Sequence, residues 1–214
     1  YQAIHAADAN ATVIAAALAP TTESGPENIS DLIYLRDLYE YGAADFSDAF
    51  AGKPYGFDFS PADRTFDADL LSFSRIVALR EIMMDYGDGK KALWASNWGW
   101  NSLPENWAGP SSDWGDVSTE EQQQFTSRAL DRAEREWPWL GGMILHHWQP
   151  DVPPDDPQWG FAVIGQDGEP TQLWDTLVNC DPSESATNGL FASRNPYARY
   201  SGTWVFSEFG ADIG

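Results

Sequence analysis

The sequence predicts an α/β fold built on a parallel sheet, and three observations favour it. Apolar runs typical of buried strands alternate four times with segments of helical periodicity. Long polar connections follow the apolar runs, and shorter ones lead into them. The chain has 214 residues, which is enough for one domain with a sizeable core. In such a fold the carboxyl ends of the strands form the functional edge.

The first two strand-helix units are predicted before residue 90. Residues 11–18 form a continuous apolar run, which indicates a buried strand. Ser30 then caps a helical pattern that Gly42 ends. A weaker strand region lies within residues 46–57, and a helical face follows over residues 73–84.

The third and fourth units follow the same order. Residues 92–96 indicate a strand, and a long loop rich in Trp, Pro and Gly comes after it. Residues 118–121 form a capping box, which predicts the start of the next helix. Residues 140–148 indicate a fourth strand, and residues 171–178 a final helix.

The character of the chain changes after residue 180. Residues 181–199 are rich in Ser, Asn and Pro and are predicted to be a linker. Residues 200–214 begin with one strand-like segment, which is too little for a domain of its own. We therefore expect one α/β domain over residues 1–180 and the stub of a β domain over residues 200–214.

Composition excludes several classes of partner. The chain has 33 acidic and 12 basic residues and a net charge of -21, so a nucleic-acid partner is not expected. Strong acidity fits a secreted or a salt-tolerant protein, and we expect an extracellular location. Cys180 is the single cysteine, which excludes an internal disulfide and a zinc quartet. No apolar run approaches the length of a membrane span, and we expect neither membrane contact nor a cofactor.

Tryptophan is unusually frequent, at 11 of 214 residues. An indole either packs in the core or offers a flat apolar face and an N–H to the ring of a sugar. Both interpretations stay open for the tryptophans in loop-like contexts, which are Trp98, Trp100, Trp107, Trp114, Trp148 and Trp159.

Three strand ends carry a resemblance to a known family. They read Lys-Pro-Tyr-Gly-Phe at residues 53–57, Leu-Trp-Ala-Ser-Asn-Trp-Gly-Trp at residues 93–100, and Ile-Leu-His-His-Trp-Gln-Pro-Asp at residues 144–151. In order and spacing, residues 1–180 resemble the second half of the (β/α)8 glycoside hydrolases of the large retaining clan, which includes cellulases, xylosidases and endo-galactanases. The resemblance implies half of a TIM barrel that acts on or binds a β-linked, glucan-type polysaccharide. The tail resembles the opening of an appended β-sandwich domain.

The resemblance also implies roles for individual residues. Asn97 occupies the position of the family's nucleophilic Glu, and Trp148 matches the eighth-strand Trp that floors the sugar site. The Asn-Glu pair that supplies the family's acid/base is not found in the sequence. The residues expected to bind substrate are Tyr55, Trp98, Trp100, His147 and Trp148.

The departure at Asn97 matters because retaining hydrolysis needs two carboxyl groups about 5–5.5 Å apart. Glu23, Asp58 and Asp151 follow three of the predicted strands and are the candidate substitutes; otherwise they are solvated loop acids. His146 and His147 are adjacent on a strand and should point to opposite faces, so we expect no metal site. Three functions of the chain therefore stay open: a divergent hydrolase, a non-catalytic carbohydrate-binding relative, or a structural fragment that another chain completes.

Four strand-helix units make an incomplete barrel, since the closed fold has eight. An open sheet leaves unpaired backbone groups at both edges and an apolar face in water. We therefore expect a homodimer, or a partner that supplies the missing half barrel, besides an oligo- or polysaccharide ligand.

Overall fold

The computed structural model describes residues 1–65 and 67–179, and its centre is a parallel sheet of four strands in the order β1-β2-β3-β4. The strands are β1 (Ile14–Ala15), β2 (Ala49–Gly52), β3 (Ala92–Trp98) and β4 (Leu140–Leu145). The helices are α1 (Gln2–Ala7), α2 (Asp31–Glu40), α3 (Arg75–Asp85), α4 (Thr119–Glu136) and α5 (Gln172–Asn179), with short 3-10 helices η1 (Ala43–Phe46) and η2 (Pro157–Phe161). This arrangement confirms the predicted α/β class with four strand-helix units, consistent with half of a TIM barrel. The predicted linker at 181–199 and the β stub at 200–214 lie outside the described residues.

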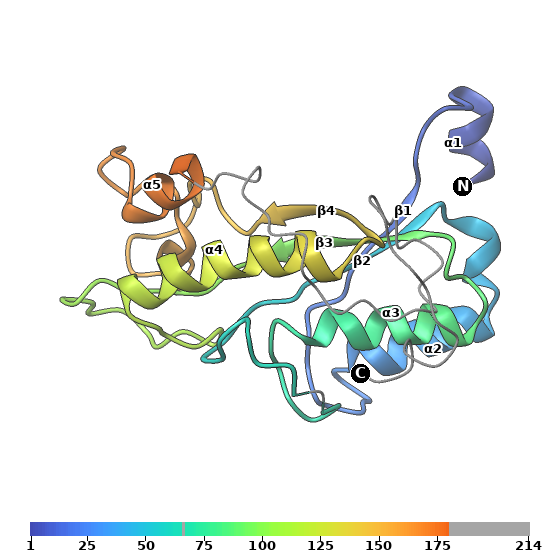
Figure 1. The fold of residues 1–214 in the computed structure, drawn as a ribbon, viewed down its shortest axis with the longest axis horizontal. Helices are drawn as coiled ribbons and strands as arrows, with labels where there is room; N and C mark the ends of the chain where they lie inside the picture. Colours follow the sequence, from blue (N-terminus) through green and yellow to red (C-terminus); the bar gives the residue numbers. More distant parts are fainter. Residues whose placement is uncertain (66, 180–214) are drawn as a thin grey trace, which may run out of the picture.

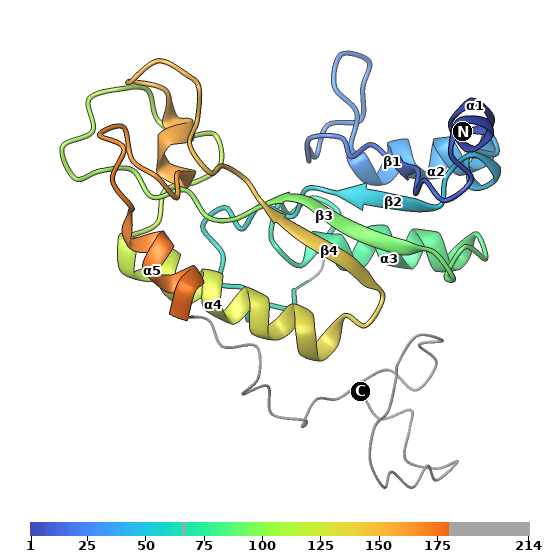
Figure 2. The same ribbon diagram turned by 90° about the horizontal axis from the view of Figure 1, so that it is seen from above.

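One face of the sheet carries the helical layer. α2, α3 and α4 lie on the same side of the strands (Figures 1 and 2). The core forms between these helices and the strand side chains that point toward them, among which Phe50, Leu93 and Ala95 are 2%, 0% and 0% exposed. Within the described residues, no helix is both long and apolar enough to cross a lipid bilayer.

The opposite face of the sheet is open. Trp94 pairs with Gly142 on this face, whereas the neighbouring pair of Ala95 and Met143 points to the helices. Ile14 and Ile144 are 36% and 53% exposed. The described residues place no helical layer over this face, so apolar side chains remain in contact with solvent there.

The glycines of β4 make room for a tryptophan on that open face. A Cβ atom at Gly141 would lie 2.3 Å from Nε1 of Trp94, and one at Gly142 would lie 2.7 Å from the same indole. The Trp94 ring therefore rests directly on the backbone of the neighbouring strand, where no larger residue fits.

The predicted helix ends are confirmed by their caps. Ser30 Oγ accepts a hydrogen bond from the Leu32 N–H, and Ser118 forms a reciprocal capping box with Glu121. Gly42 and Gly87 adopt left-handed φ angles of 81° and 75° just after α2 and α3.

The first strand differs from the prediction. Residues 11–18 were expected to form a buried strand, yet β1 spans only Ile14–Ala15 and pairs only with β2 among the described strands. Because β1 lies at the edge of the sheet, with no layer over its open face, the apolar run is only partly covered. Helix α1 was not predicted, and none of its residues is buried.

Candidate functional site

Side chains from three strands meet at the carboxyl edge of the sheet. Tyr55 lies shortly after β2, Asn97 lies near the end of β3, and His146 follows β4 directly. Tyr55 Oη donates to His146 Nδ1 at 3.2 Å, and Asn97 Nδ2 donates to the same nitrogen at 3.1 Å. We call these three residues the Tyr55 cluster. Parallel pairing brings them together, because it places the ends of consecutive strands side by side.

The His146 ring is held in its neutral form. Burial, with smaller contributions from the nearby His147 and Lys53, lowers the pKa of His146 to about 3. Because the Asn97 NH₂ group can only donate, Nδ1 acts as an acceptor and the proton of the neutral ring sits on Nε2. That Nε2 atom is buried and has no hydrogen-bond partner among the described residues. Burial also raises the pKa of Tyr55 to about 12, so its hydroxyl stays protonated and donates.

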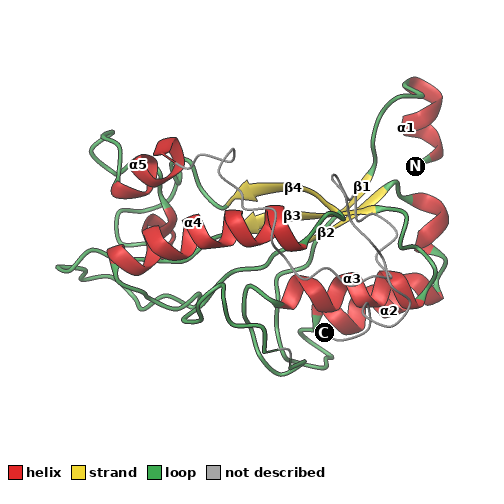
Figure 3. Cartoon of the chain, viewed as in Figure 1, coloured by secondary structure: helices red, strands yellow, loops and turns green. Residues whose placement is uncertain are grey.

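Two aromatic rings flank the cluster. Phe161, from η2, packs edge-on against His146 with ring centroids 4.7 Å apart. Trp114, from the long loop between β3 and α4, lies 6.0 Å from His146 and 6.2 Å from Tyr55. Phe161 is buried and Trp114 is half-buried, so the indole is the ring that can meet a ligand. Figure 3 shows the loops after β3 and β4 at the end toward which these strands point.

Trp98 and Trp100 belong to the core, which corrects their predicted place in a sugar groove. They are 2% and 1% exposed. Both rings pack against Phe73, at centroid distances of 6.2 Å and 5.4 Å, and Nε1 of Trp100 donates to the Phe59 carbonyl. The physical reason is a register shift between Ala95 and Trp98, after which the Trp98 ring packs into the helix-side core.

His147 and Trp148 have partners outside the Tyr55 cluster. His147 Nε2 is 2.8 Å from Gln158 Oε1, although its ring lies only 4.0 Å from that of His146. Trp148 is 60% exposed and packs edge-on against Trp174 of α5. Their roles in substrate binding stay predictions. Among the described residues, no group of three or more His, Cys, Asp or Glu side chains is arranged to hold a metal ion.

The three candidate carboxylates lie in three separate loops. Glu23 accepts hydrogen bonds from Asn28 Nδ2 at 3.1 Å and from Thr21 Oγ1, both in its own loop. Asp58 Oδ1 accepts from the backbone N–H of Asp116 at 3.0 Å. Asp151 is exposed in the loop after β4. Two of the three thus stabilise loops, and none of them belongs to the Tyr55 cluster; a catalytic role for any of them stays a prediction.

Sequence reasoning did not assign three residues to this site, which are Trp114, His146 and Phe161. Trp114 was one of several loop tryptophans, and His146 was considered only as a metal ligand. The signal for His146 was its place directly after an apolar run that ends at the functional edge. For Phe161 and Trp114 no local signal existed, because loops distant in sequence bring them to the cluster.

Comparisons with known proteins give structural matches alone. No family model and no curated protein matches the chain. A family 39 glycoside hydrolase from the gut symbiont Bacteroides cellulosilyticus is 19% identical, with a TM-score of 0.47 over 67% of this chain. The complex of Bifidobacterium dentium β-glucuronidase with coumarin-3-O-glucuronide is 17% identical, with a TM-score of 0.40 over 77% of this chain.

The chain spans only 29% of the length of each of these two structures. Both TM-scores lie below 0.5 and both identities below 25%, so the fold assignment rests on the topology of the parallel sheet itself. Function is a separate question, because one fold hosts many activities and the site decides among them.

Proposed function

We propose that the chain is a carbohydrate-active, glycosidase-like half barrel whose Tyr55 cluster binds a neutral, glucan-type saccharide without cleaving it. The observation that carries this proposal is the neutral hydrogen-bonding group of Tyr55, Asn97 and His146 beside the indole of Trp114. An extracellular location fits such a ligand and stays a prediction.

The chemistry of the cluster suits a sugar. Asn97 is half-buried, and its carboxamide can donate hydrogen bonds to ligand hydroxyls and accept from them; the His146 Nε2–H is buried and has no acceptor among the described residues. Trp114 supplies a flat apolar face of the kind that packs against the C–H groups of a pyranose ring. The net charge of -21 disfavours anionic saccharides, so the ligand is neutral.

Binding is favoured over hydrolysis because the cluster contains no carboxyl group. Retaining hydrolysis needs a carboxylate nucleophile and a carboxylic acid close together. Asn97 is a neutral amide whose Nδ2 is directed at His146. Glu23 accepts hydrogen bonds from its own loop, and Asp58 accepts one from the backbone of the loop between β3 and α4.

For the open face of the sheet we propose a second copy of the chain as the occupant. Two such sheets have the eight strands of a closed barrel, and two-fold pairing would cover both open faces at once. Exposed Ile14 and Ile144 provide apolar contact area, while the net charge of -21 opposes association. The dimer should therefore strengthen with salt. Light scattering after size exclusion at low and high salt tests this; a monomer at both salts, or a complex with a different protein, contradicts it.

The binding experiment titrates oligosaccharides from cellulose, laminarin and xylan into the protein by calorimetry. We expect binding of at least one neutral oligomer, and a loss of about tenfold or more in affinity for Trp114→Ala. Tyr41→Ala is the matched control, since Tyr41 is 88% exposed at the end of α2. No binding of any oligomer, or equal losses in the two variants, contradicts the proposal.

A further inference from the structure

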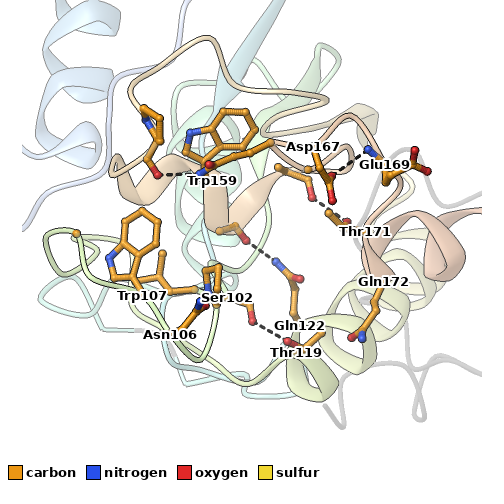
Figure 4. Close-up of a pocket in the computed structure, with 18 of the residues that line it drawn as sticks. Ser102, Asn106, Trp107, Thr119, Gln122, Trp159, Asp167, Glu169, Thr171 and Gln172 are labelled. Carbon is orange, nitrogen blue, oxygen red and sulfur yellow. Dashed lines mark hydrogen bonds between the residues drawn. The ribbon is translucent and has the colours of Figure 1, made fainter.

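A cavity of about 780 Å³ lies outside the Tyr55 cluster. One wall is the loop from Ser102 to Gly109 after β3, and the other is the segment from Pro154 to Gln172 around η2 and the start of α5. The first turn of α4 closes the floor, where Gln122 lies (Figure 4). Its volume falls within the range of small-ligand sites, about 300–1,000 Å³.

The walls of this cavity are tied to one another and to the core. Gln122 Nε2 donates to the carbonyls of Trp100 and Gly160, at 2.8 and 2.7 Å. A Cβ atom at Gly109 would lie 2.4 Å from the Asp155 carbonyl oxygen, so the two loops touch. The cavity is therefore formed before any ligand arrives, which reduces the entropy cost of binding.

Two indoles in the walls have fixed orientations. Trp107 Nε1 donates to the Pro110 carbonyl at 2.7 Å, and Trp159 Nε1 donates to the Pro153 carbonyl at 3.0 Å. Both rings are only half-buried. With the N–H groups already bonded to backbone, what these residues offer a ligand is the flat apolar ring, which suits the C–H face of a sugar.

The remaining lining sets the charge of the ligand. The ionisable side chains are Asp155, Asp167 and Glu169, and none of the described lining residues is positively charged. Figure 4 places Asp167 and Glu169 away from Trp107, in the same wall as Trp159. Carboxylates accept hydrogen bonds from hydroxyl groups and repel anions, so this lining favours a polyhydroxylated ligand without negative charge.

We propose that this cavity is a second carbohydrate site, which takes a neutral oligosaccharide between Trp107 in one wall and Trp159 with the carboxylates in the other, and rejects anionic oligosaccharides. This site does not depend on the Tyr55 cluster, because no residue is shared between them and each has its own indoles.

Calorimetry with cellotetraose tests the proposal. The double variant Trp107→Ala/Trp159→Ala should remove one binding event or weaken it by about tenfold or more. Ala108→Arg is a second variant, because Ala108 is an exposed lining residue and a longer side chain there blocks the cavity without removing an indole. Both variants should melt like the parent protein, and tetragalacturonate should not compete with cellotetraose at this site.

The outcomes separate the two sites. Loss of cellotetraose binding in the cavity variants but not in Trp114→Ala supports the cavity and counts against the Tyr55 cluster. Loss in Trp114→Ala alone leaves the proposed function intact and overturns the cavity site. Retained binding in Ala108→Arg, or equal affinity for tetragalacturonate, also overturns it. An absence of cellotetraose binding by the parent protein overturns the cavity site, and an absence of binding for the laminarin and xylan oligomers as well overturns both proposals.

Discussion

Removal of the Arg75 guanidinium should strongly destabilise the protein. Arg75 opens α3, and its side chain is 2% exposed beside the 6% exposed carboxylate of Asp31, the first residue of α2. Arg75 Nη2 lies 2.7 Å from Asp31 Oδ1 and 3.0 Å from Ser30 Oγ. The guanidinium also donates to the carbonyls of Thr21, Ala68 and Leu70. One side chain thus ties two helix starts to the loops after β1 and β2.

The size of the effect follows from what Arg75→Ala leaves behind. A buried carboxylate loses its cation, which typically costs about 3–5 kcal/mol. Native domains have a total stability of about 5–15 kcal/mol, so this is a large part of it. For a chain of this length, that loss corresponds to a melting temperature lower by about 6–20 °C.

Urea unfolding followed by tryptophan fluorescence and circular dichroism measures the loss. Arg64→Ala is the matched control, because the Arg64 side chain is 60% exposed and its ion pair with Glu136 lies at the surface. An exposed pair contributes about 0–1 kcal/mol. If Arg75→Ala loses no more stability than Arg64→Ala, the structural argument about the buried pair is wrong.

The remaining predictions concern the site and the open face. The folded-state pKa of His146 is about 3, below the ordinary value of 6.5, so the unfolded chain takes up the proton first as pH falls. The free energy of unfolding should therefore fall as pH drops from 6.5 toward 3. In urea unfolding, His146→Gln should make this free energy depend less on pH. Asn97→Glu should restore almost no hydrolysis of an activated fluoro-glycoside, and mass spectrometry of the parent chain should find no glycosyl adduct at Asn97; an adduct on any acidic residue would reveal a substitute nucleophile. Gly141→Ala should cost about 1–3 kcal/mol by displacing Trp94, whereas Ile144→Ala on the same strand should cost less; equal losses would contradict the packing argument.

The sequence alone predicted the parallel α/β class, the four strand-helix units and the ends of the helices. These features are local. Ser30 and Ser118 lie directly before helical periodicity, and a serine there can satisfy backbone N–H groups within its own turn. Alternation of strands and helices then indicates a parallel sheet and its functional edge. Tyr55 and Asn97 could be placed at that edge for the same reason.

Only the tertiary structure decided which aromatic rings are buried and which side chains meet. Trp98 and Trp148 both end apolar runs, yet one is 2% and the other 60% exposed. The difference comes from a register shift in β3 and from packing against Phe73 of a distant segment. The neighbours of His146 likewise come from separate segments of the chain: β3, the segment just after β2, the loop between β3 and α4, and η2. Burial and protonation depend on these contacts between distant residues, and they have no counterpart in the local pattern of the chain.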